Sequence, residues 1–155
     1  DDSSATVSII NDHKIRELWK SNTVMIGRLY AYTTLALAMK PNQHEYKVMG
    51  LAPYGNSSHG MQALKYFRTI EKVSGTKIVQ NSKFKDLYFH TLENLKSERF
   101  DNIAWALQEF IEETLESWVV NNIKKYGIKD IIFSGGVGQN IKLMRRLMLN
   151  KNIGP

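Results

Sequence analysis

Two segments of the sequence carry residue types suited to binding a phosphate-bearing ligand. One is FSGGVGQN, residues 133–140, in which an apolar run passes through glycines into a helical pattern. Such a turn brings bare backbone amides to a helix N-terminus, where phosphate or ribose oxygens bind well, and Asn140 can add a side-chain hydrogen bond. The spacing lacks the third glycine of a dinucleotide fingerprint and the Gly-Lys-Ser/Thr of a P-loop. Glycines that serve only close strand-to-helix packing would explain the same letters.

The other segment is HEYKVMGLAPYG, residues 44–55. It places the cation of Lys47 on one face of a short helix, beside a loop of glycines and a proline that lets a ligand approach. Lys47 could therefore pair with a phosphate or a carboxylate. Glu45 lies two residues earlier on a different helix face, so we expect it to be free to accept a ribose hydroxyl rather than to pair with Lys47. The alternative is that both are solvated surface side chains.

Other reactive groups lack partners at useful spacing. No two histidines stand in a His-x-x-x-His or His-Glu-x-x-His pattern that would aim two imidazoles at one metal ion. Ser134 lacks a Gly-x-Ser-x-Gly elbow and an evident base, which argues against nucleophilic catalysis. The histidines concerned are His13, His44, His59 and His90.

The composition indicates one globular domain. Of 155 residues, 43% are hydrophobic and 23% are charged, enough to bury a core. There is no cysteine, which excludes disulfides and thiolate metal sites and fits a reducing compartment. No apolar run approaches the roughly 18 residues needed to span a bilayer, and the first residues do not form a signal peptide. We therefore expect a soluble, cytoplasmic protein without membrane contact, and the sequence leaves an oligomer open.

The net charge of +6 favours anionic ligands such as nucleotides. A nucleic-acid-binding domain is the competing interpretation, and it predicts a steep salt dependence of binding. The charge is spread along the chain, and we expect its densest cluster, residues 142–146, to be the solvated side of a helix. We therefore do not expect a nucleic-acid partner.

Patterning predicts the elements that position these segments. Residues 5–10 and 14–20 form two strands joined by a turn at 11–13. A helix from Gly27 ends at Lys40-Pro41, because a residue before proline is pushed out of the helical region. A short helix covers 44–51, a loop 55–60, and residues 61–88 mix a short helix with weak strand signals at 77–79. A buried strand at 130–133 leads through the glycine turn into a helix at 140–149.

The strongest pattern is an amphipathic helix of about six turns between these segments. Asp101 or Asn102 can cap its first amides, and Gly127 can end it in a left-handed conformation. Trp105 and Trp118 fall on or near its apolar face, which favours a core or interface role over a stacking platform. The apolar positions are Ile103, Leu107, Phe110, Ile111, Leu115, Trp118 and Ile123.

Taken together, the two segments resemble the carbamoyltransferases grouped with nodulation proteins and antibiotic O-carbamoyltransferases. The resemblance rests on GRLY at 27–30, Thr33, MKPN at 39–42, HEYKVMGLAPYG at 44–55, and GGV-x-x-N-x-KL at 135–143. It frames residues 24–148. It implies an α/β fold of the actin-like, ribonuclease-H-like kind, in which residues 1–155 are the second half of a duplicated domain with a mixed sheet and packed helices.

The resemblance also implies a reaction and a site. ATP and carbamoyl phosphate give a carbamoyl-adenylate, whose carbamoyl group passes to the hydroxyl of a small molecule. Asn140, Gly135, Gly136 and Val137 would contact the nucleotide. Glu45 and Lys47 would line its ribose and phosphate side, with Gly55 in the loop above it.

Part of the family's site has no counterpart in this sequence. The family binds a divalent, iron-like metal through two histidines of a His-x-x-x-His motif and an aspartate, which are absent here, and Asp1 or Asp2 matches the last acid of a further stretch rather than its ligand. We therefore expect a partial domain, truncated at both ends, that is inactive alone. The alternative is a non-catalytic actin-like scaffold or nucleotide sensor.

Overall fold

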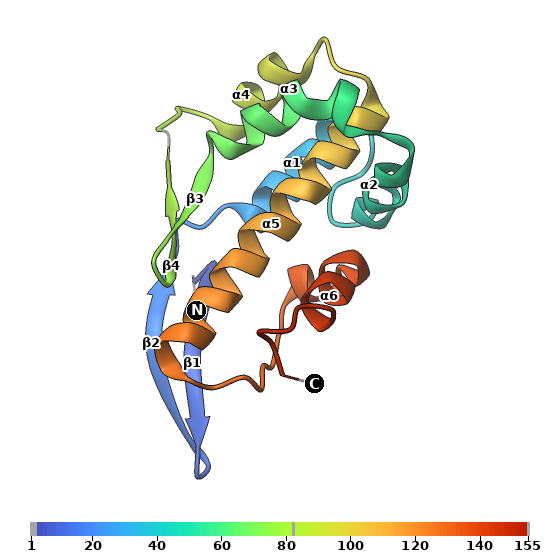
Figure 1. The fold of residues 1–155 in the computed structure, drawn as a ribbon. Helices are drawn as coiled ribbons and strands as arrows, with labels where there is room; N and C mark the ends of the chain where they lie inside the picture. Colours follow the sequence, from blue (N-terminus) through green and yellow to red (C-terminus); the bar gives the residue numbers. More distant parts are fainter. Residues whose placement is uncertain (1–2, 82, 155) are drawn as a thin grey trace.

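The fold is organised around one long helix, α5 (Phe100–Tyr126), which runs diagonally through the molecule (Figure 1). The computed structural model describes residues 3–81 and 83–154. The helix ends as predicted: Gly127 adopts φ +72°, and its amide donates to the carbonyl of Ile123. Lys124 and Lys125 in the last turn complement the negative end of the helix dipole.

The beginning of α5 differs from the prediction. Arg99 is the residue before the helix, and Asp101 lies inside the first turn instead of preceding it. The Asp101 carboxylate still accepts the amide of Asn102 at 2.9 Å, so it satisfies one first-turn donor from within. Arg99 donates two hydrogen bonds, of 3.1 and 2.7 Å, to the same carboxylate, and they lower the pKa of Asp101. The helix is consequently 27 residues long, more than the predicted six turns.

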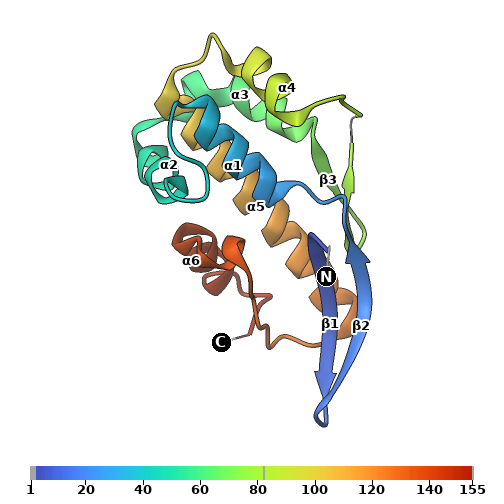
Figure 2. The same cartoon turned by 180° about the vertical axis from the view of Figure 1, so that it is seen from behind.

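In the described part of the chain, five shorter helices lie around α5. They are α1 (Ile26–Ala36), α2 (Glu45–Leu51), α3 (Ser57–Arg68), α4 (Leu87–Leu95) and α6 (Ile141–Met148), with the 3₁₀ turns η1 (Ala52–Tyr54) and η2 (Gly136–Gln139). Helices α1, α2, α3 and α6 contact α5, and α4 packs on α1 and α3. Figures 1 and 2 show α2 and α6 on the same side of α5. The core includes Phe67 of α3 stacked on Phe110 of α5, with ring centres 6.2 Å apart.

The strands form two separate antiparallel hairpins, β1 (Ala5–Asn11) with β2 (Lys14–Ser21) and β3 (Glu71–Ser74) with β4 (Lys77–Gln80). The hairpin of β1 and β2 confirms the two strands predicted at 5–10 and 14–20. Strand β4 confirms the weak strand signal at 77–79. Asp12 and His13 take φ values of 46° and 62°, as two-residue hairpin turns require. The prediction of a mixed sheet is wrong for the described residues, 3–81 and 83–154, because both of their sheets are purely antiparallel. The structure is α/β in composition, with small sheets and packed helices.

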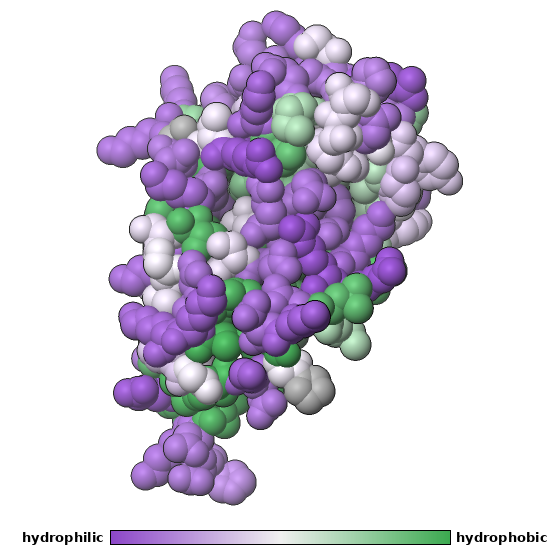
Figure 3. All heavy atoms as spheres, viewed as in Figure 1, coloured by the Kyte–Doolittle hydropathy of each residue, from purple (hydrophilic) through white to green (hydrophobic). Residues whose placement is uncertain are grey.

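The predicted strand at 130–133 is also wrong. Residues 127–135 form neither helix nor strand, and Ile132 is 83% exposed. A short apolar run becomes a strand only when another strand pairs with its backbone, and none does so in the described chain. Figure 3 shows apolar side chains gathered low on this face, near the hairpin and the end of α5, and Ile128 and Ile131 are 42% and 40% exposed.

Two helix boundaries were misplaced. The predicted loop 55–60 belongs mostly to α3, because Asn56 caps that helix: its Oδ1 accepts the amide of His59 at 3.2 Å. Helix α1 ends at Ala36 rather than Lys40, because Ala38 takes a left-handed φ of 57°. Among the described residues, no helix combines the length and apolar character needed to cross a membrane.

Candidate functional site

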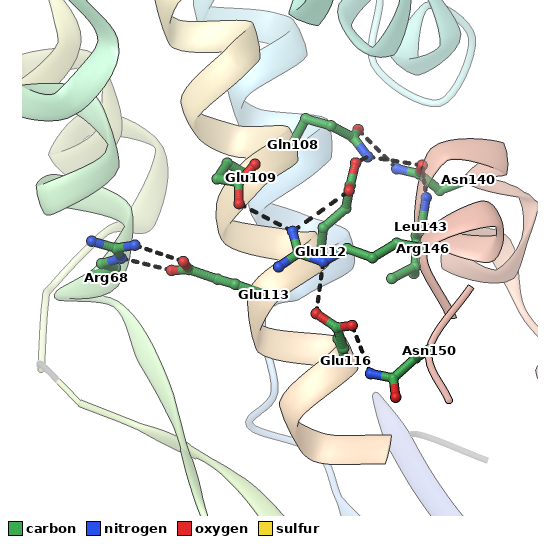
Figure 4. A network of polar contacts seen from close by, with 10 residues as sticks. All are labelled: Arg68, Gln108, Glu109, Glu112, Glu113, Glu116, Asn140, Leu143, Arg146 and Asn150. Carbon is green, nitrogen blue, oxygen red and sulfur yellow. Dashed lines mark hydrogen bonds and ion pairs between the residues drawn. The ribbon is translucent and has the colours of Figure 1, made fainter. Parts of the chain in front are cut away.

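A buried run of hydrogen bonds joins α1, α5 and α6. The Tyr30 hydroxyl donates to Gln108 Oε1 at 3.2 Å, and Gln108 exchanges two hydrogen bonds of 3.0 Å with Asn140. Asn140 Oδ1 also accepts the amide of Leu143 at 3.1 Å, which makes it the N-cap of α6. Gln108 Nε2 donates to Glu112 Oε1 at 2.6 Å. Figure 4 shows the two amides facing each other between α5 and α6.

The GRLY run at residues 27–30 reaches this network through Tyr30. Burial raises the pKa of Tyr30 above its ordinary value, and the carboxylates of Glu112 and Glu45 raise it further. Tyr30 is therefore a protonated hydrogen-bond donor at any physiological pH. Glu45 Oε1 accepts the amide of Asn42 at 2.6 Å, which holds the carboxylate at the start of α2. Glu45 is thus close enough for its charge to raise the pKa of Tyr30, which is linked to Asn140 through Gln108.

Lys47 and Gly55 have different surroundings. Lys47 is exposed, with its ammonium 5.9 Å from the ring centre of Tyr46, and it makes no ion pair within the described part of the chain. Gly55 instead packs on α5. A Cβ at Gly55 would lie 2.3 Å from the Asp101 carbonyl oxygen and 2.6 Å from Trp105 Cβ. The close approach that glycine permits here is therefore to a helix.

The glycine turn is mostly open. Gly135 takes φ +94°, a conformation that favours glycine, and both Gly135 and Gly136 are exposed. The amides of Gly138 and Asn140 bond within the turn, to the carbonyls of Gly135 and Val137. No hydrogen bond from the described residues occupies the amides of Gly136 and Val137. Two backbone donors are thus left at the start of η2, just ahead of α6.

The glycine turn also touches the start of α1 directly. A Cβ at Gly27 would be 4.0 Å from Val137 Cγ2, so the start of α1 and η2 are in contact. The GRLY run at residues 27–30 and the glycine turn, more than a hundred positions apart in the sequence, therefore meet in space. Gly27 and Val137 form the contact, and Tyr30 and Asn140 are linked through Gln108.

A second polar cluster lies further along α5. Arg146 of α6 bonds Glu116 at 2.7 Å and Glu109 at 3.0 Å, and lies 3.6 Å from Glu112. Partial burial lowers the pKa of Arg146, but the hydrogen bonds to Glu116 and Glu109 outweigh it and raise the pKa overall. The predicted solvated basic cluster is thus only partly solvated, since one cation is neutralised. An open hollow of about 490 Å³ lies beside it, lined by Glu112, Glu116, Lys142, Arg145, Arg146, Leu149 and Asn150.

The described residues contain no group of three or more histidine, aspartate or glutamate side chains placed to hold a metal ion. Asp1 and Asp2 lie outside the described residues. Trp118 is buried and meets Trp19 edge-on at 5.8 Å, and Trp105 packs against the core, which confirms their core role. Sequence reasoning missed Gln108 and Glu112. A glutamine on the apolar stripe of α5, one residue after Leu107, was the signal that could have revealed the network.

The chain is similar in sequence to several known proteins and to one protein family. An uncharacterised protein of Methanocaldococcus jannaschii is 26% identical over 97% of the chain, and one of Synechocystis is 27% identical over 79%. A tRNA N6-adenosine threonylcarbamoyltransferase of Kosmotoga olearia is 38% identical over 39% of the chain. The chain spans only 30%, 22% and 18% of the lengths of these relatives. Residues 3–152 match the family described as the carbamoyltransferase N-terminus, and the chain belongs to that family.

Proposed function

We propose that this chain supplies nucleotide-facing residues of a carbamoyltransferase. The whole enzyme would use ATP and carbamoyl phosphate to form a carbamoyl-adenylate and would pass the carbamoyl group to a hydroxyl of a small molecule. Family membership over residues 3–152 supports the reaction class. The observation that carries the site is the contact of the glycine turn with the start of α1, together with the hydrogen bonds that link Tyr30, Gln108 and Asn140.

The open groups suit an anionic ligand. Lys47 offers an exposed ammonium, and the amides of Gly136 and Val137 offer two backbone donors. Glu45 has one carboxylate oxygen bound to Asn42, which leaves the other to accept a ribose hydroxyl. We assign these four residues direct contact with the nucleotide.

Gly55 and Asn140 take indirect roles in this proposal. Gly55 lets η1 lie against α5 and thereby fixes the end of α2, the helix that carries Lys47 in its first turn. Asn140 is buried and caps α6, so its main role is to hold the glycine turn in place, with one side-chain N–H left to donate to a ligand. Gly135 contributes the left-handed backbone that shapes the turn.

The metal of the proposed enzyme needs ligands beyond the described residues, because these contain no suitable cluster. Such a divalent metal would polarise the phosphate or carbamoyl oxygens. A further part of the proposal is that the actin-like arrangement and the activity belong to a longer cytoplasmic protein and that the isolated chain is inactive. The similarity over 60 residues to the tRNA N6-adenosine threonylcarbamoyltransferase of Kosmotoga olearia supports a transfer of a carbamoyl-type group.

Isothermal titration of the full-length protein with ATP tests the site. Lys47→Ala should weaken ATP binding about tenfold, the loss of roughly one charge-assisted contact. Lys72→Ala is the matched control, because Lys72 is an exposed lysine on β3, and it should change the dissociation constant less than twofold. The absence of ATP binding by the full-length protein would refute the nucleotide site.

Pyrophosphate release tests the chemistry. Formation of carbamoyl-adenylate consumes water to release orthophosphate from carbamoyl phosphate, and the carbamate displaces pyrophosphate from the α-phosphate of ATP. Pyrophosphate release should therefore require carbamoyl phosphate as well as ATP. A protein that binds ATP but releases no pyrophosphate under these conditions would instead be a nucleotide-binding scaffold.

A further inference from the structure

We propose that Gln108 is a positioning residue of the nucleotide site, acting through Asn140 on the glycine turn. The inference rests on the proposed function. Gln108 lies on α5, outside both sequence segments, and is only 4% exposed. It therefore cannot touch a ligand at the open turn and must act through its neighbours. Its neighbours are Tyr30, Glu112 and Asn140, as Figure 4 shows for the last two.

The orientation of the Gln108 amide is fixed by groups at both ends of the network. Glu112 can only accept, so the NH₂ of Gln108 must face it. The backbone amide of Leu143 can only donate, so Oδ1 of Asn140 must face that end. With these two choices made, Gln108 Nε2 meets Asn140 Oδ1 and Asn140 Nδ2 meets Gln108 Oε1, donor to acceptor in both cases.

The hydrogen-bond inventory of Gln108 is complete. Its oxygen accepts from Tyr30 and Asn140, and its two N–H groups donate to Glu112 and Asn140. A primary amide has two donors and two acceptor sites, so nothing is left over. A side chain with every site used in a buried setting has one stable orientation, because any flip would leave several polar groups unpaired.

Asn140 is left with one free group. Its oxygen accepts from Leu143 and Gln108, and one of its Nδ2 hydrogens goes to Gln108. Its second Nδ2 hydrogen has no partner among the described residues, so any contact of the Asn140 side chain with the nucleotide is as a donor to a ribose or phosphate oxygen. Gln108 fixes this polarity without contacting the ligand.

The test is a double-mutant cycle on ATP binding by the full-length protein. Gln108→Leu and Asn140→Ala should each weaken binding about tenfold, and the double variant should be no weaker than Asn140→Ala alone, because the first residue acts only through the second. Val119→Ala is the control. It removes buried volume from α5 about 16 Å along the helix and should leave ATP affinity within twofold.

Gln108→Glu should make ATP affinity depend on pH, an effect that a change in packing alone would not produce. The introduced carboxylate has the same shape but faces two acceptors, Glu112 and Asn140 Oδ1, so ATP binding should be weak at pH 8. Protonation restores a donor on that side, so affinity relative to wild type should recover at pH 5. This variant also serves if Gln108→Leu fails to fold.

The outcomes separate the two proposals. Full coupling in the cycle together with the pH-dependent recovery supports the inference. Additive losses near a hundredfold, or unchanged affinity in Gln108→Leu while Asn140→Ala weakens binding, would overturn the positioning role and leave the nucleotide site standing. Wild-type protein that does not bind ATP would overturn both.

Discussion

Glu71, the first residue of β3, should make the protein less stable as the pH rises. Its side chain is 1% exposed, and Oε1 accepts the amide of Met25 at 2.6 Å, which ties β3 to the start of α1. Oε2 has no hydrogen-bond partner among the described residues. Burial raises the pKa of Glu71 from 4.5 to about 7, although the hydrogen bond from Met25 works in the opposite direction.

The direction of the pH effect follows from proton binding. Between pH 4.5 and about 7 the folded state holds a proton on Glu71 that the unfolded state has released, so the free energy of unfolding falls as the pH rises through this window. The stabilising contribution is complete below pH 4.5 and lost above pH 7. A rise of the pKa from 4.5 to about 7 corresponds to about 3 kcal/mol over the window.

Glu71→Gln should remove this pH dependence. The amide is neutral at every pH, resembles the protonated carboxyl, and can still accept the amide of Met25. Urea unfolding followed by tryptophan fluorescence should show similar stability for variant and wild type at pH 4.5. At pH 8 the variant should be more stable by about 3 kcal/mol.

A matched substitution isolates the effect. Glu93 is an exposed glutamate on α4 that pairs with Lys96, and Glu93→Gln should change the free energy of unfolding by less than about 0.5 kcal/mol at either pH. Taking differences from wild type at each pH cancels the titration of all other carboxylates. A Glu71→Gln difference that is equal at pH 4.5 and pH 8 would refute the reasoning.

Two further predictions concern packing and charge. Gly55→Ala should destabilise the fold by about 2 kcal/mol or more, because the new Cβ collides with the backbone of α5 and with Trp105, whereas Gly50→Ala, with no neighbour within 4 Å, should stabilise α2 by about 0.5–1 kcal/mol. Thermal melts of the two variants should shift in opposite directions. Arg146→Met should cost about 2 kcal/mol at low salt by leaving the carboxylates of α5 unneutralised, and less in 1 M NaCl; an equal loss at both salt concentrations would contradict this account.

The elements that sequence predicted correctly are those whose signals are local. The hairpin at the start of the chain has β-prone runs and a turn, and α5 has a long apolar period and a terminal glycine. Local signals also existed where the prediction failed. Asn56 is an N-cap residue at the head of α3, and treating the small residues after it as a loop overlooked that role.

The strand at 130–133 failed for a different reason. Its apolar composition is compatible with a strand, but a strand depends on a partner elsewhere in the chain, which a local pattern does not specify. The family match over residues 3–152 supports the assignment to the carbamoyltransferases. It does not specify which strand would pair with residues 130–133. The prediction of an actin-like sheet therefore stays a prediction.

Sequence alone predicted the residues of the candidate site that face the ligand but not the residues that support them, because the two groups leave different signals. Lys47 and the glycines of the turn stand out in sequence, since exposed charges beside glycines suggest contact with a ligand. Gln108 stands among the apolar residues of α5, where a polar side chain is expensive unless every hydrogen bond is satisfied. The structure shows that this condition is met through Tyr30, Glu112 and Asn140. A polar residue on a buried helical stripe therefore implies specific partners on other elements, and here those partners are Tyr30 of α1 and Asn140 at the end of the glycine turn.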